Sequence, residues 1–284
     1  MTFLDSVLQR GKQHIFAPKY IREKNQAVSN YRRIANQKTI EVEHLNNIIK
    51  EISESRDNLQ NQLNVASNFL SYAQTGEDRI ISFLFDDLGL EKPSYLDIGA
   101  NFPMHISNTY LFYQKGCQGV CIEPDPDLCS NFRKARPRDI CLNIGIGESE
   151  ADAMPLYIFD EAKGLNTFSK QDADYVQSAT RFRVSEVVQI PLRTINSLLE
   201  EYFANGLNFL SLDIEGWDYR ILRTLDFSKY TIDVVCVETI KFGTRGFREK
   251  IDHTVQLMLE KNYLVYADTH INTIFVRKDI YDGR

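Results

Sequence analysis

The feature that most limits the fold of this chain is a regular alternation, from residue 71 onward, of short apolar runs with amphipathic stretches. The apolar runs lie at 94–98, 119–124, 139–147, 207–216 and 233–240, and the stretches between several of them have the periodicity of helices. Apolar strands separated by amphipathic helices are typical of a parallel sheet that is covered on both faces. The pattern therefore predicts an α/β protein.

Two further apolar runs, 263–270 and 272–278, close the chain. The connection between them is too short for a crossover, so these two strands should pair as an antiparallel hairpin. One strand would then run against an otherwise parallel sheet. We also expect an additional strand at 154–159, inside an irregular stretch from 148 to 188 in which basic and aromatic residues intermix and would help to shape the acceptor side of the site.

Acidic residues stand at the ends of four of the predicted strands. Each could be a turn former or a helix cap, but four strand ends in one chain are a stronger signal than any single one. Ligands of open parallel sheets bind outside the carboxyl ends of the strands, where the strand order reverses. The candidate residues there are Asp97, Gly99 and Asn101, then Glu123 and Asp125, then Asp213 and Glu215, and Glu238.

The turn after the first strand argues against a dinucleotide. A pyrophosphate is usually held by G-x-G-x-x-G, but here Gly99 is followed by Asn101 and Met104 at the later glycine positions. The cofactor should lack a pyrophosphate, accept acidic neighbours and carry a ribose for Glu123. S-adenosylmethionine meets all three conditions, because its sulfonium and ammonium groups are cationic and its ribose diol can donate to a carboxylate.

Four segments resemble the FkbM-type methyltransferases, a family that uses S-adenosylmethionine on a seven-stranded Rossmann-like sheet. They are "YLDIGAN" at 95–101, "GVCIEPDP" at 119–126, "NFLSLDIEGWDYRIL" at 208–222 and "VVCVET" at 234–239, and "SYAQTGED" at 71–78 is similar to a segment that precedes the domain in one branch. The resemblance covers about residues 71 to 277. The chain has Pro103 where the family's second glycine lies, so His105, Ser107 and Asn108 become candidates for polar contacts to the cofactor.

The resemblance also implies roles for individual residues. Asp97, Gly99 and Asn101 would line the methionine half of the cofactor, Glu123 the ribose, and Asn143 with Ile144 the adenine edge. Gln74 and Glu77 would lie near the cofactor's amino acid. Asp213 and Glu215 would face the transferred methyl group, with Glu238 alongside.

An alcohol acceptor must lose a proton during methyl transfer, and Asp213, Glu215 and His105 are the candidate bases. A divalent ion held by Asp213, Glu215 and Glu238 is an alternative that we do not predict. Together with the strand-end acids, the resemblance implies an O-methyltransferase, and the range of the family implies a sugar hydroxyl of a glycan or glycolipid as its acceptor. Two alternatives remain: a nicotinamide-dependent sugar-modifying enzyme, and a coiled-coil assembly protein whose Rossmann-like domain is inactive.

The first 40 residues differ in charge from the rest of the chain. They hold eight Lys and Arg against two acids, whereas the whole chain has a net charge of −6. A basic helical arm on an acidic body indicates an anionic partner for the arm, such as a membrane surface or a polyanionic glycan, unless the arm is only a solvated lead-in. Nucleic acid fits poorly, because phosphate would be repelled by the acidic body. We divide the chain into the basic arm (1–40), a coiled-coil helix (41–70) and the methyltransferase domain (71–284).

Residues 42–70 carry an apolar heptad pattern. At alternating spacings of three and four, the positions read Val42, Leu45, Ile49, Ile52, Arg56, Leu59, Leu63, Ala66 and Leu70. Such a seam predicts a coiled coil, hence a homo-oligomer, in which Arg56 would help to set the register or the number of strands. In the alternative, one long helix packs its apolar stripe against its own globular domain.

The five cysteines are odd in number, and none forms a C-x-x-C pair. We interpret them as reduced core thiols. No apolar run approaches the roughly 20 residues that cross a bilayer, and residues 1–13 lack the features of a secretory signal. We therefore expect a soluble cytoplasmic protein that is peripheral to the inner face of the membrane if the arm binds anionic lipids.

Overall fold

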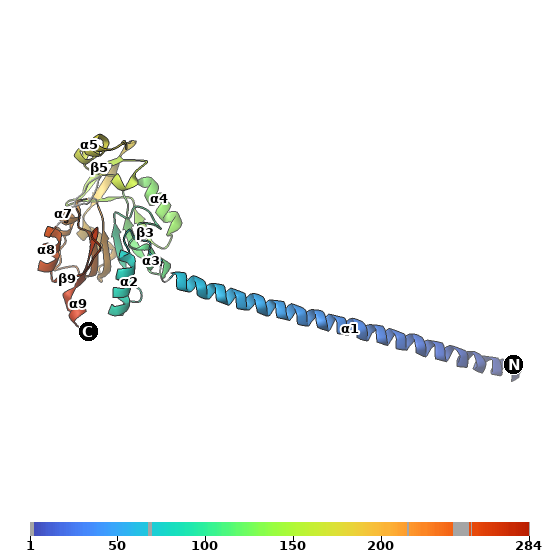
Figure 1. Ribbon diagram of the computed structural model, residues 1–284. Coiled ribbons are helices and arrows are strands. Elements are labelled where there is room, and N and C mark those ends of the chain that lie inside the picture. Colours follow the sequence, from blue (N-terminus) through green and yellow to red (C-terminus); the bar gives the residue numbers. More distant parts are fainter. Residues whose placement is uncertain (1–2, 68–69, 215, 241–249, 251, 284) are drawn as a thin grey trace. The chain divides into compact units, whose positions relative to one another are not determined.

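The computed structural model describes residues 3–67, 70–214, 216–240, 250 and 252–283, with side chains described from residue 19 and omitted again at 63–69. The chain forms two compact units, Met1–Leu70 and Ser71–Arg284. Figure 1 labels their helices and strands. Each unit is described by itself below.

The first unit is built on one helix, α1 (Phe3–Ser67). The helix predicted from the heptad pattern is therefore present. The apolar seam residues Val42, Leu45, Ile49, Ile52 and Leu59 expose between 55% and 63% of their surface. Among the described residues, no helix combines the length and the apolar character that crossing a membrane requires.

The second unit contains a seven-stranded sheet, which confirms the predicted fold class. Its strands, in spatial order, are β3 (Ile140–Leu142), β2 (Gly119–Ile122), β1 (Tyr95–Ile98), β7 (Leu207–Leu212), β8 (Ile232–Glu238), β10 (Asn272–Arg277) and β9 (Tyr263–Asp268). β10 is antiparallel to both of its neighbours, as the short hairpin connection predicts. The strand order reverses between β1 and β7, which places a ligand site at the carboxyl ends of these strands.

Helices cover both faces of this sheet (Figure 1). One apolar core lies between the sheet and α6 (Ile195–Tyr202), α7 (Asp218–Leu222) and α8 (Asp252–Glu260). A second lies on the opposite face against α2 (Glu77–Leu88), α3 (Tyr110–Gln114), α4 (Pro126–Ala135) and α9 (Lys278–Asp282). Neighbouring residues on β1 alternate between the two cores, Tyr95 on one face and Leu96 on the other. This two-sided burial explains why the strands read as continuous apolar runs.

A small second sheet was not predicted. The run at 139–147 is not one strand: it splits into β3 and β4 (Gly145–Ile146), and β4 joins a three-stranded sheet with the order β4-β6-β5. The chain turns between them because the Asn143 amide donates to the carbonyl oxygens of Glu123 and Pro124 at 3.0 and 2.8 Å. β5 (Ala151–Ile158) matches the additional strand expected at 154–159.

The other elements of this part of the chain were not predicted, because they bury few apolar side chains. In β6 (Glu186–Arg193) only Ile190 is buried, and in α5 (Lys170–Ala179) only Ala173 and Val176 are. A short 3₁₀ turn, η1 (Lys163–Leu165), precedes α5. These elements close over the carboxyl ends of the main sheet and form the upper part of the second unit in Figure 1.

All five cysteines are buried free thiols, as predicted. Cys121 and Cys236 lie inside strands of the main sheet, where each contributes a small apolar side chain to the core.

Candidate functional site

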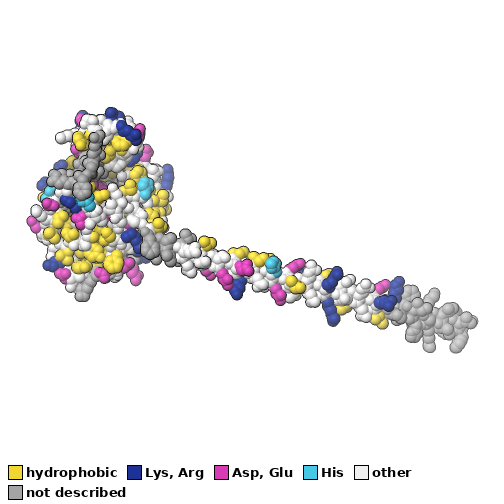
Figure 2. Space-filling model, in the orientation of Figure 1, with side chains coloured by type: hydrophobic (Ala, Val, Ile, Leu, Met, Phe, Trp, Pro, Cys, Tyr) yellow, Lys and Arg dark blue, Asp and Glu magenta, His cyan; other side chains and the backbone are white. Residues whose placement is uncertain are grey.

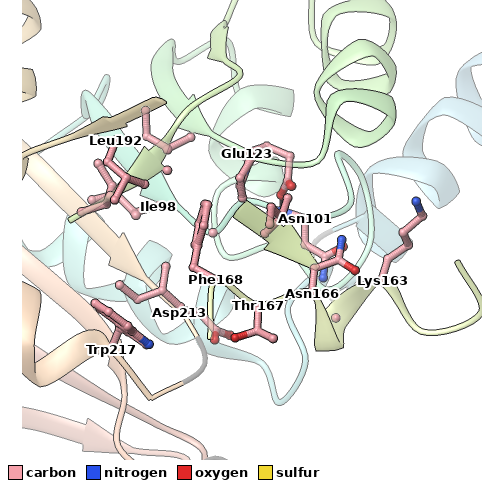
Figure 3. Close-up of a pocket in the computed structure, with 18 of the residues that line it drawn as sticks. Ile98, Asn101, Glu123, Lys163, Asn166, Thr167, Phe168, Leu192, Asp213 and Trp217 are labelled. Carbon is pink, nitrogen blue, oxygen red and sulfur yellow. Dashed lines mark hydrogen bonds between the residues drawn. The ribbon is translucent and has the colours of Figure 1, made fainter. Parts of the chain in front are cut away.

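An open cavity lies between the carboxyl ends of the main sheet and the second sheet. Figure 3 shows its lining residues. The loops after β1, β2 and β7 contribute Gly99 and Asn101, Glu123 and Pro124, and Asp213, Ile214 and Trp217. The second sheet and its connections add a mostly apolar wall. The cavity is therefore at the strand-order reversal where the sequence placed the site.

Glu123 occupies the end of β2 in this wall. One carboxylate oxygen accepts from the backbone N–H of Asn101 at 2.8 Å, and the other accepts from the N–H of Asp125 at 2.7 Å. Burial raises the pKa of Glu123 to about 8, although these two N–H groups lower it. Each oxygen keeps a second lone pair, so the carboxylate can accept further hydrogen bonds from a diol.

Asn101 lines the cavity together with Glu123 and offers a side-chain oxygen as a hydrogen-bond acceptor. Its backbone adopts a left-handed conformation with φ of 50°, and its Oδ1 atom is buried without a hydrogen-bond partner among the described residues. A buried acceptor without a partner costs free energy unless a ligand or water supplies a donor. Asn101 is thus suited to receive an N–H or ammonium donor of a bound molecule.

Gly99 makes the cavity wall possible through backbone packing. Its φ is 80°, and a Cβ atom placed on it would stand 1.8 Å from the carbonyl oxygen of Asp213. No other residue type fits there without moving one of the two loops. The missing side chain therefore accommodates the neighbouring strand end as well as leaving space for a ligand.

Asp97 does not line the cavity. Its carboxylate accepts from the Thr109 hydroxyl and lies in a buried cluster around Arg136, which is 0% exposed. Arg136 donates to Asp139 at 2.7 Å, to the Tyr95 hydroxyl at 3.1 Å and to Thr109 at 3.0 Å. Burial raises the pKa of Asp97, and Arg136 and Thr109 oppose this rise. The residue predicted to contact the cofactor instead supports the loop that forms the wall.

The residues around Pro103 also turn away from the cavity. The Pro103 carbonyl oxygen and the Ser107 hydroxyl both accept from Arg136 at 3.4 Å, and Asn108 donates to the Ser211 hydroxyl at 3.2 Å. His105 is exposed and stacks on Phe102 with ring centroids 4.3 Å apart. The loop thus presents Ile106 to the cavity in place of these polar candidates.

Gln74 and Glu77 lie outside the cavity wall as well. Gln74 is exposed, whereas Glu77 is fully buried and accepts from Thr269 at 2.7 Å and from Asn272 at 2.9 Å. Burial raises the pKa of Glu77, but the hydrogen bonds from Asn272, Thr75 and Thr269 outweigh it and hold that pKa below its usual value. Glu77 ties the start of α2 to the β9–β10 turn.

The predicted adenine edge is shifted by one or two residues. Asn143 is used to turn the chain, and Ile144 packs against the core of the main sheet. Gly145 and Ile146, which follow them, line the cavity. The side chains of Leu192 and Phe168 pack closely on Gly145.

The loop after β7 supplies the acidic and aromatic end of the cavity. Asp213 and Trp217 line the same region (Figure 3). The guanidinium of Arg220 covers one face of the Trp217 ring at 4.0 Å. Of the other predicted acids, Glu238 is buried at the end of β8 outside the wall, and Glu215 lies outside the described residues.

Asp218 stabilises this loop and was not predicted. Its carboxylate accepts from the backbone N–H groups of Ile214 and Gly216, both at 3.1 Å. Burial, followed by the neighbouring Asp213, raises the pKa of Asp218 to about 8. The sequence signal was the acid at the start of α7, which reads equally well as an ordinary helix-capping residue.

The second sheet is tied to the end of β2 by an ion pair. Lys163 Nζ lies 2.8 Å from Asp125 Oδ2, and the Asn166 amide donates to the same oxygen at 3.0 Å. Asp125 also caps α4 through the N–H groups of Asp127 and Leu128. Lys163 and Phe168, a basic and an aromatic residue of the 148–188 stretch expected to shape the acceptor side, are in the wall. Asn166 and Thr167, which the sequence analysis did not single out, are there as well. In the part of the chain that the structure describes, no cluster of three or more candidate ligands could hold a metal ion.

Comparison with known proteins connects this site to one family. The sequence model described as "Methyltransferase FkbM domain" matches residues 97–265, more than half of the chain. No curated protein matches the sequence.

Several solved structures show a likeness at low identity. They include an O-methyltransferase from Bacillus cereus in complex with SAH (11% identity, 76% of this chain and 86% of that chain, TM-score 0.35). They also include a TehB-like SAM-dependent methyltransferase from Corynebacterium glutamicum (11% identity, 80% of this chain and 99% of that chain, TM-score 0.33). A third is a 1,6-didemethyltoxoflavin-N1-methyltransferase from Burkholderia thailandensis (12% identity, 72% of this chain and 77% of that chain, TM-score 0.35).

Proposed function

Because the chain belongs to the FkbM methyltransferase family, whose cofactor is S-adenosylmethionine, we propose that it methylates a hydroxyl group of a sugar-containing acceptor. The observation that carries this proposal is the convergence of Glu123, Asn101 and Asp213 on one cavity from the ends of three strands. Family membership favours methyl transfer over nicotinamide chemistry and over an inactive assembly role.

The cavity residues suit the cofactor. The free lone pairs of Glu123 can accept from a ribose diol, and Asn101 Oδ1 can accept from the cofactor's ammonium group. Gly145 and Ile146 offer an apolar surface for the adenine ring. The bound cofactor would supply an electrophilic methyl group on a positively charged sulfur.

Asp213 is the residue we assign as the general base. It lies in the wall on the side away from Glu123, where an acceptor hydroxyl would approach (Figure 3). Its carboxylate would take the proton of that hydroxyl as the new carbon–oxygen bond forms. Asp218 holds the backbone of the loop through Ile214 and Gly216, so it positions Asp213 without contacting the acceptor.

Trp217 supports the choice of a sugar as the acceptor. Arg220 covers one face of its ring, and the residue lines the cavity next to Asp213. An aromatic ring beside a carboxylate provides an apolar surface for the C–H face of a pyranose and an acceptor for its hydroxyl groups. The surrounding wall of Met154, Leu156 and Phe168 would exclude water from the reacting atoms.

The test uses the full chain in two steps. Calorimetric titration with S-adenosylhomocysteine should show one site per chain, and Asp152→Asn, an exposed acid outside the cavity, should bind equally well. Transfer of a labelled methyl group to a carbohydrate-rich extract of the source cells should then give a product that glycosidases or mild acid release as a methylated monosaccharide. Label found only in protein or in a lipid without sugar would reject the sugar acceptor but would still agree with methyltransferase activity.

A separate measurement tests the metal alternative. Activity that persists in EDTA would agree with a side chain as the base and would reject a metal-assisted mechanism.

We also propose that the basic arm brings the enzyme to an anionic surface. The described part of the arm presents Lys19, Arg22, Arg32, Arg33 and Lys38 on an exposed helix. Such a cluster attracts acidic lipids within a Debye length. Co-sedimentation with vesicles that contain phosphatidylglycerol should fall when residues 1–40 are removed and when salt is raised. Equal binding by the truncated chain would reject this role.

A further inference from the structure

The apolar seam of α1 has no part in the proposed methyl transfer. We define the seam as the heptad positions of α1 from Val42 to Ala66. Its described apolar members are more than half exposed, and Figure 2 shows apolar side chains at the surface along this helix. Because most of the stability of helices in proteins comes from packing an apolar face, a long helix with an exposed apolar stripe calls for a partner helix.

We propose that the seam pairs with the seam of a second copy of this chain in a parallel, two-stranded coiled coil. The occupant is a second copy because the seam is complementary to itself. With the two helices in register, every layer except that of Arg56 joins identical apolar side chains.

The side chains of the seam favour two strands over three or four. The first positions hold the β-branched Val42 and Ile49, followed by Arg56 and Leu63, and the fourth positions hold Leu45, Ile52, Leu59 and Ala66. The β-branched first positions and the leucines at fourth positions follow the pattern that favours a two-stranded parallel coil, whereas Ile52, Leu63 and Ala66 depart from it.

Arg56 strengthens this choice. It occupies a first position, where a two-stranded coil leaves the long side chain at the edge of the core and its guanidinium in water. A coil of three or four strands would enclose the same cations. Arg56 Nη2 lies 2.9 Å from Asp57 Oδ1, with both side chains mostly exposed, so each copy brings an acid that partly neutralises its own arginine.

The same residue sets the orientation. In a parallel coil both copies of Arg56 fall in one layer, so only that layer loses apolar contact. In an antiparallel coil each Arg56 faces an apolar residue of the other chain, so two layers are disrupted. Burial of apolar surface is roughly proportional to the layers kept, which favours the parallel arrangement.

The positions beside the seam permit identical chains to pair. In the parallel register they bring together Glu41 with Asn46, Ile48 with Ser53, and Ser55 with Gln60. No pair joins like charges, and no pattern of opposite charges demands a different partner.

In a parallel coil, the order of the chain places both basic arms at one end of the coil, and both catalytic units follow its other end.

The first experiment measures the mass of the full chain by sedimentation equilibrium at micromolar concentration. We expect twice the chain mass of 32.9 kDa. The double variant Ile49→Asp/Ile52→Asp should sediment as a monomer and still bind S-adenosylhomocysteine like the parent, since neither residue belongs to the cavity. A monomeric parent, or a parent of three or four chains, would overturn the proposal.

The second experiment tests the orientation. Val42→Cys should form a covalent dimer with glutathione disulfide, because parallel pairing brings the two introduced thiols together. Asn47→Cys, on the outer side of the same helix turn, is the matched control and should not cross-link. The native cysteines are all buried and do not compete. A dimer whose Val42→Cys variant remains uncross-linked would show that the helices run antiparallel.

Discussion

Two groups of buried ionisable side chains in the second unit differ in how their charge is balanced. Behind β1, the Arg136 cluster (Tyr95, Asp97, Thr109, Arg136 and Asp139) pairs a buried cation with buried acids through hydrogen bonds within the chain. In the cavity, the hydrogen bonds to Glu123 come from two backbone N–H groups, and burial raises its pKa to about 8. Equal burial therefore serves stability in one place and leaves a carboxyl group for the ribose diol of a ligand in the other.

Removal of the cation from the Arg136 cluster should have the largest effect. We expect Arg136→Met to lower the free energy of unfolding by about 3–5 kcal/mol, because Asp139 and Asp97 would stay buried without a counter-charge. Urea denaturation measures this loss. Lys134→Met removes a cation from the exposed side of the same region and should change stability by no more than about 0.5 kcal/mol. Similar losses in both variants would mean that the cluster is not a stabilising unit.

A change at the reacting end of the cavity should affect rate and spare the fold. We expect Asp213→Asn to reduce kcat at least ~100-fold, because an amide cannot take the acceptor's proton. Methyl transfer from labelled cofactor measures the rate, and urea denaturation should give the variant the same free energy of unfolding as the parent. Asp152→Asn is the control. A rate close to that of the parent would remove Asp213 from the role of base.

Substitution of Glu123 should mainly weaken ligand binding, whereas substitution of Arg136 should mainly lower stability. We expect Glu123→Gln to weaken S-adenosylhomocysteine binding by roughly 10- to 100-fold, since charge-assisted hydrogen bonds contribute about 1.5–3 kcal/mol. Stability should fall by only about 1 kcal/mol, because the amide nitrogen of glutamine cannot accept from one of the two backbone N–H groups, while the substitution also removes an acid whose charged form is disfavoured by burial. Calorimetry and urea denaturation give the two values. Unchanged affinity together with reduced stability would place Glu123 with the structural acids.

The smallest expected effect is a dependence of binding on pH. In the free protein Glu123 has a pKa of about 8, so below that pH it is mostly protonated, whereas a ribose diol donates to its ionised form. Affinity for S-adenosylhomocysteine should therefore rise with pH toward 8, by at most about tenfold per pH unit. Glu123→Gln should flatten this slope, and any slope that remains belongs to other groups such as Asp218, whose pKa is also about 8.

The stability of the free protein should change in the opposite direction. A carboxyl whose pKa is raised in the folded state binds its proton more tightly there than in the unfolded chain. The contribution of Glu123 to folding is therefore most favourable below its ordinary pKa of 4.5 and is lost as pH rises toward 8. Urea denaturation of the parent and of Glu123→Gln across this range measures the difference, and parallel curves would contradict the raised pKa.

Local sequence signals were sufficient for the main sheet and for part of the site. The sheet could be predicted from the apolar runs of β1, β2, β7 and β8 and from the short hairpin between β9 and β10. Strands that are buried on both faces consist of nearly continuous apolar residues, so they are easy to recognise in the sequence. Gly99, Asn101, Glu123 and Asp213 could be named because strand ends collect at one edge. The second sheet could not, since strands that bury one or two residues carry no periodicity of that kind.

The sequence by itself determined the α/β class, the edge of the sheet at which ligands bind, and the long heptad helix. Only the tertiary structure decided which acids face that edge. Asp97 and Glu123 read alike in the sequence, but Asp97 pairs in register with Cys121 and points to the face that holds Arg136, whereas Glu123 lies beyond the end of β2 and turns into the cavity. When both faces of a strand are apolar, alternation gives no sign of side-chain direction, so the packing of Asp97 toward the distant Arg136 is decided only in the folded chain.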